Sequence, residues 1–324
     1  MGIPVTEQAD YSKLIDKEIW AFIHRTQQYY PDDTTKRTIE EQRAIYTGLC
    51  DFFSDGYPED VSSEDATIVS HVYDVPVRRY QSSKSNSNTI VVYMHGGGFV
   101  VGGLDSHDSI CAELCSKTGY KVTSVDYRLS PEHKHPAAFD DCLACVESEA
   151  QLNNVPVLLC GDSAGGNLAA AVAHRLSTLA KAEKKVKLVG QALIYPELGG
   201  DTTVGSYLTH ANAPMLTSDE VSFYLQVRVD TELPLSDPSF APLHASSFSG
   251  LPETLVVSAE CDPLSDDGRN YCDAIVKAGG VARWINEPGL VHGFLRARHT
   301  SVRARESFES IIEALKKLGT SCTG

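Results

Sequence analysis

Between residues 89 and 318, short apolar segments alternate with longer segments of helical periodicity. The expected strands are Thr89–Met94, Val122–Tyr127, Pro156–Cys160, Leu188–Tyr195, Thr254–Ala259 and Ala282–Asn286. The expected helices are Ser106–Thr118, Pro136–Ala150, Ala164–Leu179, Asp266–Lys277 and Thr300–Leu318. Continuous apolar runs such as Ile90–Tyr93 are typical of strands buried on both faces, and alternating strand–helix units favour a parallel sheet. The pattern predicts an α/β fold with a mostly parallel central sheet flanked by helices.

The segments outside this alternation have other patterns. Apolar residues recur at helical spacing in Tyr11–Tyr30 and in Thr38–Phe53, where Thr38 and Glu41 form a possible capping box. Thr67–Gln81 alternates apolar and polar residues, which predicts two exposed strands around Asp74. Residues 199–235 are rich in Gly, Pro and Ser, with one short helix expected near Ser218–Gln226. We interpret this stretch as an insertion that lies over the strand ends.

Charge and composition exclude several classes of partner. Lys and Arg number 28 against 43 Asp and Glu, a net charge of −15. This charge disfavours nucleic acid and anionic membranes, which both need neutralising cations. No apolar run reaches the roughly 18 residues of a membrane helix, and the N-terminus lacks the pattern of a signal peptide. We therefore expect a cytoplasmic protein. Gly2–Thr6 fits an N-myristoylation pattern only loosely, while a homodimer and a regulatory protein partner stay open.

The nine cysteines lie mostly in apolar segments. An odd number in such positions favours reduced, buried thiols over a disulfide framework. Cys142 and Cys145 form a CxxC pair, and Cys111 and Cys115 are four residues apart in an expected helix. No second pair provides zinc-ribbon spacing, so we interpret both pairs as core packing and expect no metal.

Gly161-Asp162-Ser163-Ala164-Gly165 is a G-x-S-x-G pattern between an expected strand and an expected helix. A sharp strand–turn–helix of this kind exposes a nucleophilic serine and leaves no room for side chains on the flanking residues. Backbone N–H groups at the helix N-terminus favour developing negative charge. The alternative is a simple Gly-Ser helix cap. We predict that Ser163 is a nucleophile, supported by Gly161, Asp162 and Gly165.

His95-Gly96-Gly97-Gly98 follows the expected strand Thr89–Met94. Consecutive glycines let the backbone turn and direct N–H groups into a cleft. Together with the Ala164 N–H, this loop predicts an oxyanion hole, with His95 and Gly96 as support. A phosphate-binding loop is the alternative, but neither G-x-x-x-x-G-K-[ST] nor G-x-G-x-x-G occurs here.

A serine nucleophile of this kind needs an acid and then a histidine, in that chain order. Asp262 follows the strand Thr254–Ala259 and precedes a proline that holds it extended. Glu260 is the rival acid, whereas Asp266 and Asp267 fit charges at a helix N-terminus.

Two histidines, His292 and His299, follow Asp262 in the chain. His292 lies in a Gly-flanked loop just past the last strand, where it can reach the serine. His299 lies in the basic stretch Arg296–Arg305, which we interpret as a solvated helix surface. We therefore select His292.

Five motifs together resemble the hormone-sensitive-lipase-like family of α/β-hydrolase esterases, and within it bacterial acetyl esterases: His95–Gly98, Asp126–Glu132, Gly161–Gly166, Asp262–Leu264 and His292–Phe294. The resemblance extends from about residue 75 to the C-terminus. It implies a triad of Ser163, Asp262 and His292, and an oxyanion hole of Gly97, Gly98 and Ala164. It departs from the family at Ser130 and Ala241, where Ala and Ser are usual.

The resemblance also implies an architecture and an activity. Residues 1–60 and an insertion at about 199–235 are expected to form a helical cap on an α/β-hydrolase catalytic domain, 61–324. The expected reaction is hydrolysis of small esters with short acyl chains, acetyl to about butyryl, through an acyl-enzyme and without metal or cofactor. A deacetylase of acetylated sugars, an amidase, and a non-catalytic binding or regulatory protein are the alternatives. Arg128 and Glu132 are expected to pair with nearby charges and fix a loop.

Overall fold

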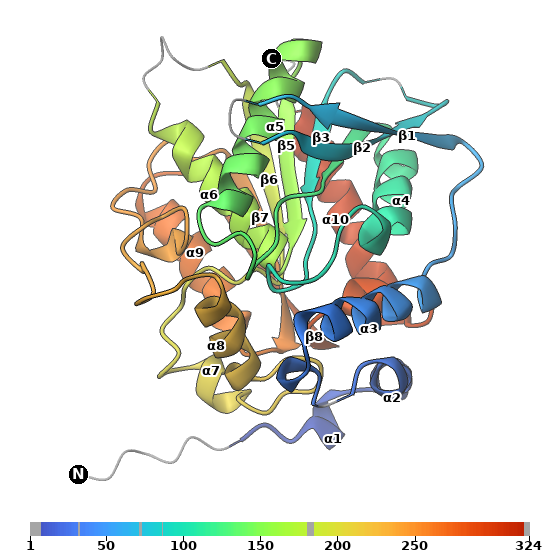
Figure 1. Cartoon of the computed structure of the whole chain (residues 1–324), viewed down its shortest axis with the longest axis vertical. Coiled ribbons are helices and arrows are strands. Elements are labelled where there is room, and N and C mark those ends of the chain that lie inside the picture. Colours follow the sequence, from blue (N-terminus) through green and yellow to red (C-terminus); the bar gives the residue numbers. More distant parts are fainter. Residues whose placement is uncertain (1–7, 32, 71–72, 86, 180–184, 321–324) are drawn as a thin grey trace.

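The computed structural model describes residues 8–31, 33–70, 73–85, 87–179 and 185–320. Within these ranges one sheet has the strand order β1-β2-β4-β3-β5-β6-β7-β8 (Figure 1). The strands are β1 Val61–Ile68, β2 Val75–Ser82, β3 Ile90–Met94, β4 Lys121–Val125, β5 Val157–Asp162, β6 Leu188–Ile194, β7 Glu253–Cys261 and β8 Ala282–Val291. Only the pairs β1–β2 and β2–β4 are antiparallel. The prediction of a mostly parallel sheet is confirmed.

Helices cover both faces of the sheet (Figure 1). The main helices are α2 Lys17–Tyr29, α3 Ile39–Phe52, α4 Asp108–Thr118, α5 Ala137–Asn153, α6 Ala164–Ser177, α8 Ser218–Val227, α9 Ser265–Lys277 and α10 Val302–Thr320. One face packs against α4 and α10, the other against α5, α6 and α9. Both faces are therefore closed to water, which is why the strands are apolar in continuous runs.

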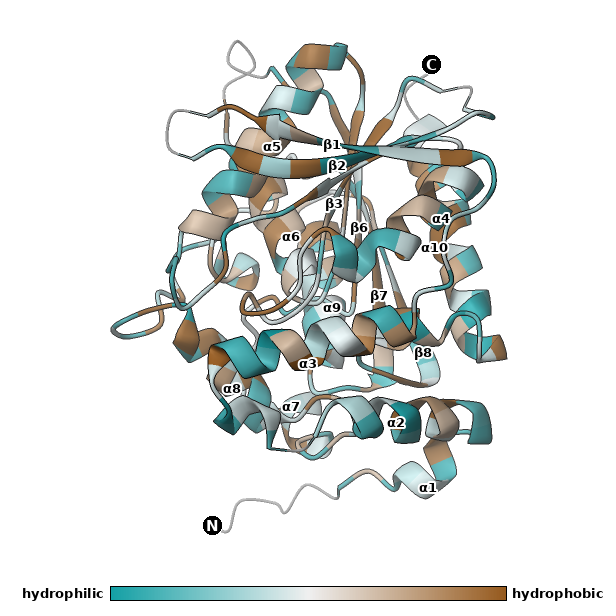
Figure 2. Ribbon diagram, turned by 45° about the vertical axis from the view of Figure 1, so that its right-hand side comes forward, coloured by the Kyte–Doolittle hydropathy of each residue, from teal (hydrophilic) through white to brown (hydrophobic). Residues whose placement is uncertain are grey.

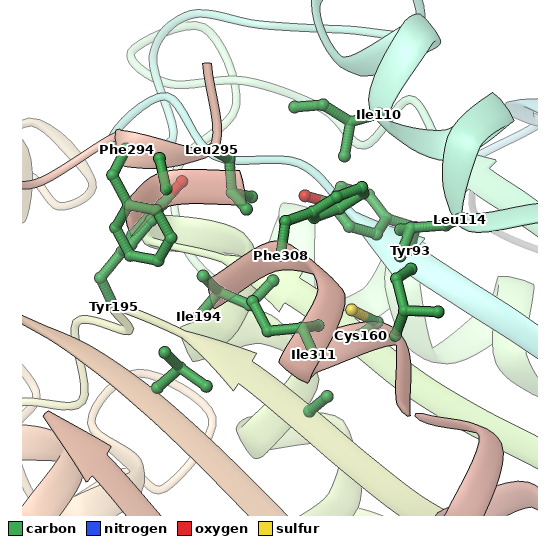
Figure 3. Close-up of a cluster of buried hydrophobic side chains, with 14 of the residues drawn as sticks. Tyr93, Ile110, Leu114, Cys160, Ile194, Tyr195, Phe294, Leu295, Phe308 and Ile311 are labelled. Carbon is green, nitrogen blue, oxygen red and sulfur yellow. The ribbon is translucent and has the colours of Figure 1, made fainter. Parts of the chain in front are cut away.

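Alternate residues of the central strands supply the two cores. Tyr93 of β3 and Cys160 of β5 lie with Phe308 and Ile311 of α10 (Figure 3). Val92, on the opposite face, belongs to the cluster that includes the fully buried Cys142 and Cys145 of α5. All cysteines among the described residues are buried and reduced.

Several elements differ from the sequence-based expectation, among them β8, which continues to Val291 instead of ending at Asn286. The first helical segment is broken, because Asp16 accepts hydrogen bonds from the N–H groups of Glu18 and Ile19 and so begins α2 anew after a short α1, Tyr11–Leu14. The edge strand β1 begins at Val61 rather than Thr67; its first residues are largely exposed and carry no apolar alternation, so the sequence pattern did not reveal them. The second strand, β2, was expected to be exposed, but Val75, Val77 and Tyr80 are buried because β2 lies inside the sheet, between β1 and β4. The capping box of Thr38 and Glu41 is confirmed.

The helices α2, α3, α7 (Ser206–Thr209) and α8 gather at the end of the molecule where the parallel strands terminate (Figure 1). In Figure 2 these helices carry hydrophilic and hydrophobic residues in alternation, as amphipathic elements covering a sheet end must. None of the helices in the described ranges has the length and apolar character to span a bilayer. The myristoylation pattern of Gly2–Thr6 lies outside the described residues.

Candidate active site

Ser163 lies at the turn between β5 and α6, at the carboxyl end of the sheet. Its backbone has φ 55° and ψ −119°, a strained conformation for a residue with a side chain. A Cβ at Gly161 would collide with the Gly165 backbone, and one at Gly165 with the Met94 carbonyl. The Ser163 N–H donates to the Ile194 carbonyl at 2.9 Å, which ties the turn to β6. The turn is thus fixed by its neighbours with the serine at its apex.

Asp262 and His292 converge on this serine from the ends of β7 and β8. His292 Nε2 lies 2.9 Å from Ser163 Oγ, and His292 Nδ1 lies 2.7 Å from Asp262 Oδ2. Asp262 is fully buried, and its Oδ1 accepts the N–H of Leu264 at 2.9 Å. Each oxygen of the Asp262 carboxylate therefore has one partner, the Leu264 N–H or His292 Nδ1, and the carboxylate orients the imidazole.

The rival acids are engaged elsewhere. Glu260 accepts the Gly289 N–H at 2.7 Å, and Asp266 accepts the Ser206 N–H at 2.9 Å. Asp267 is buried and accepts the N–H groups of Leu198 and Gly200, so it secures the loop after β6. Although both aspartates are in the first turn of α9, each binds a distant loop rather than solvent.

The interpretation of Arg296–Arg305 as solvated helix surface is wrong for its first part. Arg298 is only 2% exposed and its Nη2 lies 2.6 Å from Glu113 Oε1. His299 precedes α10 and also contacts Glu113, at 2.7 Å. The buried carboxylate of α4 draws this basic segment inward, a long-range pairing that local sequence does not display.

The glycine loop after β3 turns toward Ser163. Gly97, Gly98 and Phe99 all have positive φ, of 126°, 58° and 64°. Among the described residues, the N–H groups of Gly97, Gly98 and Ala164 have no protein acceptor. By contrast, the Gly96 N–H donates to Asp162 Oδ1 at 2.9 Å. The N–H groups of Gly97, Gly98 and Ala164 are therefore available to accept an anion as a partner.

Asp162 joins the elbow to this loop. Besides the Gly96 N–H, its carboxylate accepts the Tyr93 hydroxyl at 2.7 Å and faces His107 Nε2 at 3.3 Å. Burial alone would raise the pKa of Asp162, but the charge and hydrogen bond of His107 together with the Tyr93 phenol outweigh it and hold the pKa below its ordinary value. Asp162 therefore stays anionic and anchors the loop.

His95 packs beneath the glycine loop, where it is fully buried. Its ring stacks on Tyr127 with centroids 4.2 Å apart, and Nδ1 lies 2.8 Å from the Gly96 carbonyl oxygen. Burial, with the nearby His107, lowers the pKa of His95 to about 3. The imidazole is therefore a neutral packing element.

Two arginines, Arg43 and Arg128, form ion pairs with the segments around the glycine loop. Arg43 of α3 donates to the Val100 carbonyl at 2.9 Å and pairs with Glu132 at 2.7 Å. Arg128 pairs with the buried Asp141 at 2.8 Å. The expected pairing of Arg128 and Glu132 with neighbouring charges is confirmed.

A cavity of about 530 Å³ opens beside Ser163 and His292. Its walls come from α2, α3, α8 and the segments after β3, β6 and β8. The hydroxyl groups of Tyr30 and Tyr224 lie 3.0 Å apart and join the N-terminal segment to α8. Most of the lining is apolar, with Ile23, Leu49, Ile110, Leu225 and Leu295 among its residues. The cavity is suited to a small, mainly apolar molecule.

Several lining residues have no signal in the sequence. Tyr46, His107 and Arg296 reach the cavity from three elements far apart in the chain. Only the fold brings them together, so motif spacing could not reveal them. In the part of the chain that the structure describes, no group of three or more His, Cys, Asp or Glu is arranged to hold a metal ion.

Comparison with known proteins finds the same fold and relatives named as esterases. A family model described as the alpha/beta hydrolase fold matches residues 91–296. Carboxylesterase NlhH of Mycobacterium tuberculosis is 37% identical over 255 residues, which cover 75% of this chain and 78% of the relative. Ethyl acetate hydrolase of Pseudomonas putida is 30% identical over 294 residues, covering 88% and 90%.

Solved structures extend the similarity to nearly the whole fold. The hyperthermophilic esterase of the archaeon Pyrobaculum calidifontis superposes with a TM-score of 0.83 at 29% identity, covering 93% of this chain and 98% of that one. The family match spans more than half of the 324 residues and includes the serine turn and the glycine loop. The chain therefore belongs to the hormone-sensitive-lipase-like family of α/β hydrolases.

Proposed function

We propose that this protein is a serine carboxylesterase that hydrolyses small esters with short acyl chains. The observation that carries the proposal is the continuous hydrogen-bonded series Asp262–His292–Ser163, with distances of 2.7 and 2.9 Å, at the wall of the cavity. Nucleophile, base and orienting acid in mutual contact are the parts that acyl transfer needs.

The reaction has two half-steps. Ser163 Oγ attacks the ester carbonyl carbon as His292 Nε2 takes its proton, and the tetrahedral intermediate expels the alcohol, which receives that proton. Water then attacks the acyl-enzyme, again giving its proton to His292, and the acid leaves as Ser163 is restored. Asp262 holds the imidazole with Nε2 toward the serine and stabilises the imidazolium formed in each half-step.

The oxyanion is assigned to the N–H groups of Gly97, Gly98 and Ala164. Their lack of protein acceptors among the described residues supports this role, as does the anchoring of the preceding Gly96 by Asp162. A preorganised donor of this kind contributes roughly 10²–10³ in rate. In this proposal residues 1–60 and about 199–235 form the cap, and a small-molecule ester is the only partner required.

The short acyl range rests on two observations. The mainly apolar cavity of about 530 Å³ must hold the acyl and alcohol parts together. One relative, 30% identical, is named an ethyl acetate hydrolase.

The test combines a substrate panel with a covalent label. We expect purified protein to hydrolyse 4-nitrophenyl acetate and butyrate, and a fluorophosphonate to modify Ser163, detected by peptide mass spectrometry. The Ser163→Ala variant should lose both properties, while Ser222→Ala, at an exposed position on α8, should keep them. Turnover of 4-nitroacetanilide or an acetylated sugar in place of the esters would assign an amidase or a sugar deacetylase instead.

A further inference from the structure

Arg296 is a cation in the wall of the substrate cavity. It belongs to the short 3₁₀ helix Phe294–Ala297, which directly follows the His292 loop, and it is partly buried. The same cavity is lined by Ser163 and His292, so a molecule bound beside the serine shares its space with this guanidinium.

The guanidinium of Arg296 is bound only by neutral groups. Nη1 donates to the Ser106 carbonyl at 3.1 Å and Nη2 to the Tyr46 hydroxyl at 3.0 Å. A guanidinium has five N–H donors, so most of its capacity is unused. No carboxylate of the described residues lies within ion-pairing distance of Arg296.

The other buried arginines are neutralised differently. Arg298 contacts Glu113 at 2.6 Å, Arg128 contacts Asp141 at 2.8 Å, and Arg228 has Glu197 at 3.8 Å. Keeping an unpaired charge away from water costs free energy. Among the described residues, Arg296 is thus the partly buried arginine without a carboxylate in direct contact, although the charge of Asp162 acts on it at longer range, and it faces the cavity.

The surroundings strengthen any interaction made there. Ile23, Leu49, Ile110 and Leu295 line the cavity, and apolar walls increase the attraction between opposite charges. Thr26, 5% exposed, also lines it, and its Oγ1 has no hydrogen-bond partner among the described residues. That oxygen is itself buried, so the unused group that a bound molecule meets is the Arg296 guanidinium.

Four acidic residues line the cavity: Asp162, Glu197, Glu220 and Asp219, the last of which is exposed in the first turn of α8. Asp162 binds Tyr93, Gly96 and His107, as described above. Glu197 accepts from Asn167 and from the Gly199 N–H. Glu220 closes the capping box of Thr217 at the start of α8. None of these carboxylates competes for the Arg296 guanidinium by direct contact.

We propose that Arg296 forms an anion subsite, so that the preferred esters carry a carboxylate on their acyl or alcohol part. This inference rests on the proposed esterase function. A planar guanidinium matches a carboxylate through two parallel hydrogen bonds, which supplies both affinity and orientation.

The experiment compares charged and neutral esters of similar size. Mono-4-nitrophenyl glutarate against 4-nitrophenyl valerate tests an anion on the acyl part. 4-Acetoxybenzoate against 4-methylphenyl acetate tests one on the alcohol part. Each pair is measured with wild type, Arg296→Met and Arg296→Lys. The ratio of wild type to variant cancels the intrinsic reactivity of each ester.

We expect Arg296→Met to raise KM for the charged ester of one pair about 10- to 100-fold more than for its neutral partner, as befits loss of a charge-assisted pair. For Arg296→Lys, the difference in KM between charged and neutral ester should lie between those of wild type and Arg296→Met. Arg175→Met, which removes the same charge from an exposed position on α6, is the matched control and should show no such difference. Equal losses for charged and neutral esters in both pairs would overturn the subsite.

A binding measurement separates this result from failure of the proposed function. Calorimetry on Ser163→Ala, which cannot turn over, compares glutarate and benzoate with their uncharged amides. Preference for the anion, lost in the double variant Ser163→Ala/Arg296→Met, supports the subsite even if no ester is hydrolysed. Absence of any preference for the anion would reject the subsite. If wild type still hydrolysed esters, the proposed esterase function would remain supported.

Discussion

The backbone of Ser163 stores strain, which the proposed role of this residue as nucleophile would explain. At φ 55° and ψ −119° a glycine is more comfortable than any residue with a Cβ. Ser163→Gly and Ser163→Ala should both abolish esterase activity. Ser163→Gly should nevertheless be more stable than Ser163→Ala by about 1 kcal/mol, because relief of strain exceeds the entropy that glycine adds to the unfolded chain. Urea unfolding of the two variants checks the order, and a more stable alanine variant would argue against strain.

Asp262 and Asp267 allow a direct comparison of two buried aspartates. Asp262→Asn offers His292 an amide in place of a carboxylate and should lower kcat by about 10⁴-fold, as loss of the orienting acid does in serine hydrolases. Asp267→Asn lies outside the series of contacts to Ser163 and should cost less than tenfold. Steady-state kinetics on one 4-nitrophenyl ester distinguishes the two. Similar small losses in both would remove Asp262 from the triad.

Asp267 should also make the stability of the fold depend on pH. Burial, with the nearby charge of Glu197, raises its pKa from 3.8 to about 8. The neutral form is thus favoured in the folded state. The contribution of protonated Asp267 to the stability of the folded state is fully present below pH 3.8, declines as the pH rises, and is lost above about pH 8.

Asp267→Asn removes this titration. As the pH is raised from 5 to 9, the free energy of unfolding of the variant should therefore increase relative to that of wild type by a few kcal/mol, measured by urea unfolding. Asp273→Asn, at an exposed position on the same helix, is the control and should show no such trend. A constant difference across this pH range would show that Asp267 does not titrate within it.

At the scale of elements, α8 is connected to the glycine loop by Arg228. Its guanidinium lies 3.6 Å from the centroid of the Phe99 ring and 4.0 Å from that of Phe240, and it is only 3% exposed. Phe99 has positive φ and follows the two glycines assigned to the oxyanion. The cation that ends α8 thus packs directly against the residue that follows this loop.

Arg228→Met should lower kcat more than it raises KM, because the substitution removes a contact of the glycine loop and leaves the cavity wall intact. It should also lower stability by about 2–4 kcal/mol, since Glu197 loses its buried partner. Burial already raises the pKa of Glu197. Adding Glu197→Gln should restore part of the stability, measured by urea unfolding of single and double variants. Full additivity of the two changes would show that the pair is not coupled.

Local sequence patterns were sufficient for the elements that carry the site. Central strands such as β3 and β5 could be predicted because each is an apolar run ended by a turn, and Ser163 because its turn requires glycine at fixed positions. The end of β8 could not, because Glu287 and Gly289 interrupt the apolar pattern before Val291. The boundary of β1 and the break at Asp16 could not, since an exposed edge strand and a capping side chain leave the apolar pattern unchanged. Arg296, His107 and Arg228 act through partners in distant segments, so only the folded chain shows their roles.

At the scale of the molecule, we expect the acyl length accepted to depend on how the proposed cap closes the cavity. Helices α2, α3 and α8 form its walls, and the Tyr30–Tyr224 contact joins two of them. Each methylene that fits adds about 0.8 kcal/mol of burial, whereas one that does not fit must displace packed side chains at a cost of about 1–3 kcal/mol. Length should therefore help until the acyl chain meets the cap and then oppose turnover.

With 4-nitrophenyl esters, kcat/KM should hold or rise from acetyl to butyryl and fall at least tenfold by octanoyl. Leu49→Ala, which shortens a buried side chain of α3 in the cavity wall, should move the optimum to longer chains, because the removed atoms leave space for the substrate. Leu315→Ala deletes the same atoms from the core beneath α10, where no substrate can reach, and should lower stability without moving the optimum. An optimum at decanoyl or longer in wild type would contradict the proposed short acyl range.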